Sequence, residues 1–168
     1  MRPDSVLLLW LAFIAVHDFR RRIVPNWLVL AGAAAALVQL SLGFQPVGIS
    51  WSEALLGLAA GFGVLLLFYA VGVMGAGDVK FAGALGLWVG PTALAPIWIG
   101  GSLLAASHGI LWLALQRWPL LPRLALLLAN QHAPNDGPLA TKRRARFVPY
   151  AAYLALATAV WLIWGRQR

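Results

Sequence analysis

Two of the five acidic residues in this chain, Asp18 and Asp78, are candidates for catalysis. Each follows an apolar run, short before Asp18 and longer before Asp78, so both are expected at the edge of a membrane and at a similar depth. Two acids at the ends of neighbouring helices can meet and act together. The other acids have structural explanations: Asp4 lies near the N-terminus, Glu53 opens a helix, and Asp136 lies in a polar loop.

A close pair of carboxyl groups can hydrolyse an amide. The two groups cannot both ionise, so one keeps a proton and the other remains a base. The base takes a proton from an attacking water, and the protonated member polarises the carbonyl. Such a pair titrates as a unit. The chain has no cysteine, and its histidines at 17, 108 and 132 are too scattered to predict a metal cluster, so we expect no metal and no cofactor.

The glycines at 75 and 77 precede the second acid in the string Gly75-Ala76-Gly77-Asp78-Val79-Lys80. Two glycines with this spacing permit positive φ and close backbone approach. A tight turn with a capping Asp78 uses the same residues, and Asp18 alone is also suited to pair with Arg20–Arg22. Lys80 either favours a singly charged acid pair or extends to the lipid headgroups.

The composition predicts an integral membrane protein. Of the 168 residues, 61% are hydrophobic and 11% charged, against roughly 45–50% and about 25% in a soluble domain. We predict one all-α, polytopic, membrane-embedded domain over 1–168, with about six transmembrane helices. The predicted helices are 5–17, 24–43, 54–77, 79–90, 93–116 and 147–165. They follow from charge-free stretches, of which the long one at 81–116 is divided into the fourth and fifth helices by Gly90-Pro91.

The net charge of +8 predicts an orientation. All but Arg2, Arg166 and Arg168 of the 13 basic residues fall on one side of the six-helix arrangement, which is cytoplasmic by the positive-inside rule. Both termini are then outside. Basic residues of this kind favour a membrane partner over nucleic acid. Tryptophans near predicted span ends are expected at the interfaces, namely Trp51, Trp88, Trp118 and Trp164.

Other features receive structural interpretations. The cytoplasmic loop 117–146 contains an apolar stretch consistent with an interfacial helix. His108 is expected to pack inside a span, bonded to Ser102, Ser107 or a backbone carbonyl. Small residues at 57–63 and 82–86 allow close helix packing. Gly57→Ala is expected to be mild.

The two acid-bearing segments together resemble the type IV prepilin peptidases, membrane aspartic peptidases of the Gly-x-Gly-Asp class. The first segment is Asp18 followed by Arg22-Ile23-Val24-Pro25-Asn26, and the second is Gly75 to Lys80. The helix order, the Gly-rich fourth helix ending in Trp88-Val89-Gly90, and Val148-Pro149-Tyr150 before the last helix extend the resemblance over most of the chain.

The resemblance implies specific roles. Asp18 and Asp78 match the catalytic aspartates, while Gly75, Gly77 and Lys80 match other motif positions. Pro25 and Asn26 match a segment that breaks and restarts a helix and shapes the site. The implied substrates are prepilins and pseudopilins, cut between a basic leader and an apolar helix. The implied location is the bacterial inner membrane, with the site at its cytoplasmic face.

Two departures from the family pattern bear on activity. Larger members carry an N-terminal domain with paired cysteines and also methylate the new N-terminus. This sequence has no cysteine and no room before Asp18, so it resembles the peptidase-only form that accompanies Tad/Flp-type pili. Ala151 and Ala152 stand where many relatives have glycine.

Alternative functions predict different placements of the acids. A proton- or cation-coupled transporter predicts acids near the midplane and helices broken at the span centres. No motif in the sequence excludes a non-catalytic scaffold.

The N-terminal apolar run could also belong to a secretory signal, although no small-residue cleavage site follows it.

Overall fold

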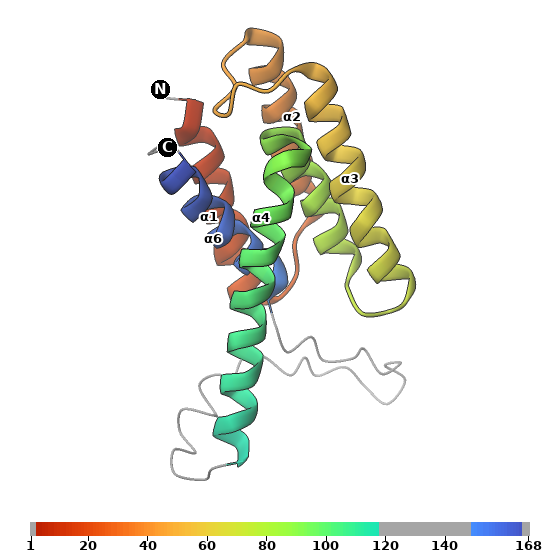
Figure 1. Ribbon diagram of the computed structural model, residues 1–168, viewed down its shortest axis with the longest axis vertical. Coiled ribbons are helices and arrows are strands. Elements are labelled where there is room, and N and C mark those ends of the chain that lie inside the picture. The colour runs from red at the N-terminus through yellow and green to blue at the C-terminus, as the bar shows by residue number, and fades with distance from the viewer. Residues whose placement is uncertain (1–2, 118–148, 166–168) are drawn as a thin grey trace.

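The computed structural model describes residues 3–117 and 149–165, and these residues fold into α-helices joined by short connections. The helices are α1 (Pro3–Arg21), α2 (Asn26–Leu42), α3 (Trp51–Ala70), α4 (Ala76–Arg117) and α6 (Tyr150–Gly165). α4 is interrupted at Gly90, whose φ of 73° and ψ of 175° are not helical, and the chain reverses there (Figure 1). The expected break at Gly90-Pro91 and the all-α class are therefore confirmed.

Much of the helical surface is apolar and exposed. α3 and the stretch Ala76–Ala114 of α4 are long and apolar enough to cross a membrane. Their exposed side chains include Leu67 at 68% and Ile99 at 63%. Exposed apolar surface of this extent suits lipid contact. The number of spans stays a prediction.

The ends of the helices divide into two groups (Figure 1). The described chain ends, at the start of α1 and the end of α6, lie together. α1 ends at the opposite end of the bundle, where α4 and α6 begin. This arrangement agrees with both termini lying on one side, while the side of the membrane remains a prediction. The predicted interfacial helix of loop 117–146 falls outside the described residues.

α3 packs tightly against the first part of α4 through glycines. A Cβ on Gly57 would overlap the backbone of Gly86, and one on Gly61 would overlap the carbonyl of Ala82. Close packing by small residues is confirmed. Gly57→Ala should destabilise the fold, because the added methyl group would collide with backbone atoms, which cannot rotate away, while its mild effect on activity stays a prediction.

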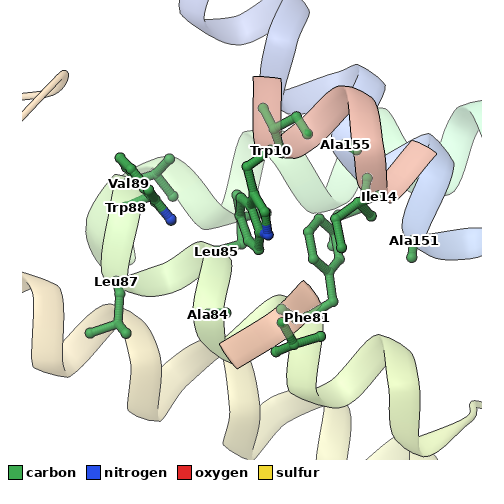
Figure 2. Close-up of a cluster of buried hydrophobic side chains, with 14 of the residues drawn as sticks. Trp10, Ile14, Phe81, Ala84, Leu85, Leu87, Trp88, Val89, Ala151 and Ala155 are labelled. Atoms are coloured by element: carbon green, nitrogen blue, oxygen red, sulfur yellow. The ribbon is translucent and has the colours of Figure 1, made fainter. Parts of the chain in front are cut away.

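Large aromatic rings fill the space between α1 and the first part of α4 (Figure 2). The ring centroid of Trp10 lies 5.3 Å from that of Phe81 and 6.2 Å from that of Trp88. Trp88 is fully buried, so the interfacial interpretation is wrong for this residue. Trp51 and Trp164, by contrast, are exposed.

Both buried indoles are anchored to α2. Trp10 Nε1 donates to the carbonyl of Leu28 at 2.8 Å, and Trp88 Nε1 donates to the carbonyl of Gly32 at 3.0 Å. A Cβ on Gly32 would overlap the Trp10 ring. A glycine is therefore needed here for α2 to approach the aromatic cluster.

Candidate active site

Asp18 lies in the last turn of α1 and is 3% exposed. Its Oδ2 accepts a hydrogen bond of 2.9 Å from the backbone N–H of Ala152, in the first turn of α6. The first N–H groups of a helix have no acceptor within that helix, and the helix dipole favours negative charge at this end. The start of α6 therefore supplies a ready donor that holds the carboxyl group of Asp18.

The chain turns sharply after Asp18. Arg22 has a positive φ of 52°, and its N–H donates to the carbonyl of Asp18 at 2.8 Å, which ends α1. Pro25 then adopts an extended conformation and caps α2, whose first residue is Asn26. The expectation that Pro25 and Asn26 break and restart the helix is confirmed.

Asp78 lies in the first turn of α4 and is 2% exposed. Its N–H donates to the carbonyl of Gly75 at 3.1 Å. Positive φ at Gly75 and Gly77 is not observed. In this connection the left-handed position is Gly72, with a φ of 77°. α4 therefore begins at Ala76, between the two glycines that were expected to form the turn, and the turn itself lies at Gly72.

Gly77 instead lies beside Val24, at a distance that leaves room for a Cβ. A Cβ placed on it would lie 3.5 Å from the Cβ of Val24 and 3.7 Å from the Val24 backbone nitrogen. The start of α4 thus lies directly against the linker between α1 and α2. This contact joins the two acid-bearing segments.

The fold brings Asp18 and Asp78 to the same end of the bundle. Ile14 precedes Asp18 by one turn on α1, and Phe81 follows Asp78 by one turn on α4. Figure 2 shows Ile14 and Phe81 next to each other, with the Trp10 ring on the other side of Phe81. The acids therefore lie one turn beyond this pair, toward the same end of the bundle, while their depth in a membrane stays a prediction.

Lys80 extends away from the acids. Its Nζ donates to Oδ1 of Asn26 at 3.0 Å, and its side chain is exposed. Two residues along a helix correspond to a rotation of about 200°, so Lys80 and Asp78 occupy nearly opposite faces of α4. Lys80 thus links α4 to α2.

Comparison with known proteins establishes the family. Residues 5–110 match the type IV leader peptidase family. The chain belongs to this family. The matched segment contains both Asp18 and Asp78 and ends before α6.

Relatives named prepilin leader peptidase/N-methyltransferase are similar to the chain. The one from Aeromonas salmonicida (strain A449) is 29% identical over 170 residues, which cover 96% of this chain and 49% of the relative. The one from Bacillus subtilis (strain 168) is 32% identical over 113 residues, which cover 64% of this chain and 43% of the relative. The chain thus spans about half the length of the Aeromonas relatives. No solved structure matches it.

His108 packs against the ring of Tyr153, in the first turn of α6. The two ring centroids lie 5.7 Å apart, and Tyr153 also meets Phe19 edge-on at 5.6 Å. The serines proposed as its partners bond elsewhere: Ser107 donates to the carbonyl of Leu104, and Ser102 pairs with the Tyr150 hydroxyl. The contacts of His108 are those of a packing residue.

Within residues 3–117 and 149–165, no group of three or more His, Cys, Asp or Glu side chains lies close enough to hold an ion.

Sequence reasoning missed the backbone donor of Ala152. The Pro149-Tyr150 pair signals the start of a helix, and helix starts offer unpaired N–H groups. Nothing in the sequence states which side chain will use such a donor, because Asp18 is 134 residues away. Gly32 was also missed, although a glycine within an alanine-rich helix is a local sign of close approach.

Proposed function

We propose that this chain is a membrane aspartic endopeptidase that removes the basic leader from prepilins or pseudopilins. One observation carries the proposal: two buried carboxyl groups from different helices, Asp18 and Asp78, lie at one end of the bundle, and a backbone N–H holds the first. Membership of the leader peptidase family supports the substrate class.

The two acids divide the chemistry between them. Negative charge is stabilised at both positions, because Asp18 Oδ2 accepts the N–H of Ala152 and Asp78 lies in the first turn of α4. We assign the base to Asp18, whose carboxylate accepts this hydrogen bond from the start of α6. Asp18 takes a proton from water as the water oxygen attacks the scissile carbonyl carbon. Asp78 gives its proton to the carbonyl oxygen. When the tetrahedral intermediate collapses, the proton on Asp18 passes to the leaving amine and Asp78 recovers its own.

The site faces the cytoplasm in this proposal. Arg20 and Arg21 end α1 beside Asp18, and basic residues concentrate on the cytoplasmic side of membrane proteins. A prepilin would present its leader at this face of the inner membrane, with its apolar helix in the lipid. We propose peptidase activity without methyl transfer, in the manner of the Tad/Flp-type form.

Transport receives less support from the structure. A proton or cation relay needs acids along the membrane interior. Asp18 and Asp78 lie instead at helix ends.

Amide variants of the acids test the proposal. Asp18→Asn and Asp78→Asn keep the side-chain shape but can neither accept nor share the proton, so each should lower cleavage of a reconstituted prepilin at least about 100-fold. Glu53→Gln is the matched control. Glu53 belongs to a capping box with Ser50 at the start of α3, and glutamine serves the same box.

The comparison is made at equal amounts of membrane-inserted protein. The control should cleave at the unsubstituted rate. Cleavage by either aspartate variant at that rate would refute the aspartic-peptidase mechanism.

A further inference from the structure

An apolar groove lies over the first part of α4, between α2 and α3. Its volume is about 350 Å³. Its walls come from Val29 and Ala33 of α2 and from Leu58 and Phe62 of α3, and Gly83 of α4 lies between them. Among the residues that line it, only Lys80 carries a charge.

The groove lies on the opposite side of α4 from the candidate active site. Lys80 follows Asp78 by about 200° of helical rotation and Gly83 follows it by about 140°. Phe81, which shares the face of Asp78, packs instead on Trp10 of α1. A peptide bond held at Asp78 therefore leaves the groove free for another occupant.

Lys80 is fixed at one end of the groove. One N–H of its ammonium group donates to Asn26 Oδ1, and an ammonium group has three donors. Asn26 begins α2, so this end of the groove is the end at which α1 stops and α4 begins. An exposed lysine stem along apolar surface, with its ammonium at the membrane edge, is suited to a phosphate group.

We propose that this groove binds an anionic phospholipid, with an acyl chain between α2 and α3 and the headgroup phosphate on Lys80. Basic pockets between transmembrane helices on the cytoplasmic side bind anionic headgroups in this way. A zwitterionic headgroup is disfavoured because no lining residue is acidic and could pair with its amine. The proposal is independent of the peptidase activity.

Photolabelling tests the site directly. The full chain is placed in phosphatidylcholine nanodiscs that contain phosphatidylglycerol with a diazirine on one acyl chain. Labelled peptides are then mapped by mass spectrometry. We expect label on Val29 and Leu58. A phosphatidylcholine probe with the same chain should label them several-fold less.

Two variants separate the headgroup from the groove. Lys80→Gln keeps a donor for Asn26 but removes the charge, and it should lower phosphatidylglycerol labelling about fivefold, the factor a lysine contributes near an anionic surface. Ala33→Phe fills the groove and should abolish labelling there. Ala95→Phe makes the same change at an exposed position of α4 outside the groove and should leave it unchanged.

The opposite results would overturn the proposal. Equal labelling by the two lipid probes, or labelling unaffected by both Lys80→Gln and Ala33→Phe, would exclude a specific anionic site. Crosslinking of the groove to a second copy of the chain or to a diazirine-bearing prepilin helix, in place of the lipid, would assign it to protein.

Discussion

The hydrogen bond from Ala152 to Asp18 can be removed without changing any side-chain functional group. Ala152→Pro deletes the N–H that Asp18 accepts, and a proline in the first turn of a helix sacrifices no intrahelical bond. Ala151→Pro is the matched control, because it adds the same ring to the neighbouring alanine, and both alanines are fully buried. The two variants therefore share the cost of overpacking but differ in the Asp18 donor.

The size of the effect follows from the bond. A hydrogen bond to a charged group contributes about 1.5–3 kcal/mol, and each 1.36 kcal/mol corresponds to about tenfold in rate. We expect Ala152→Pro to lower kcat roughly 10- to 150-fold relative to Ala151→Pro, with KM little changed. The assay is cleavage of a purified prepilin by enzyme in nanodiscs.

The thermal midpoints of the two proline variants are compared in parallel. Similar midpoints with a large difference in kcat would support a positioning role for α6. If Ala152→Pro cleaved as fast as Ala151→Pro, the reasoning that α6 positions Asp18 would fail.

Three further predictions concern packing, cofactors and orientation. Gly77→Val should reduce cleavage roughly 100-fold at equal expression, because displacing a catalytic group by about 1 Å has that effect. Gly57→Ala should instead reduce the amount of folded protein, measured as the thermal midpoint, since it breaks the α3–α4 contact. Activity should survive EDTA, and loss of cleavage restored by a divalent ion would contradict this. Cysteines placed at 75–77 and 135–143 should react with a reagent applied to the cytoplasmic side, and one at Gly48 from outside; reaction of both groups from one side would contradict the six-span arrangement.

Local sequence signals were sufficient for the helix breaks. Gly90-Pro91 and Pro25-Asn26 interrupt helices in this chain, because proline lacks an N–H and glycine tolerates non-helical angles. The positions of Asp18 and Asp78 at helix ends followed from charge-free runs. These predictions need no knowledge of which helix packs on which.

Features that depend on partners could not be predicted. The segment 72–77 contains three glycines, and the choice of Gly72 for the left-handed position depends on where α4 starts to pack. Trp88 stands near a predicted span end, but its indole meets the Gly32 carbonyl and is buried. Gly57 resembles any other glycine in a span until Gly86 is placed against it.

The two acids are positioned by separate parts of the fold. Asp78 belongs to the first part of α4, which the glycine contacts with α3 hold tightly. Asp18 belongs to α1, whose end is held by the N-terminus of α6. Between these two supports the rings of Trp10 and Phe81 act as spacers, so their size sets the separation of α1 and α4 near the acids. A peptide carbonyl must fit between two carboxyl groups. In the proposed mechanism, the spacing set by these buried rings, with α6 holding one acid and α3 supporting the other, would leave that room between α1 and α4.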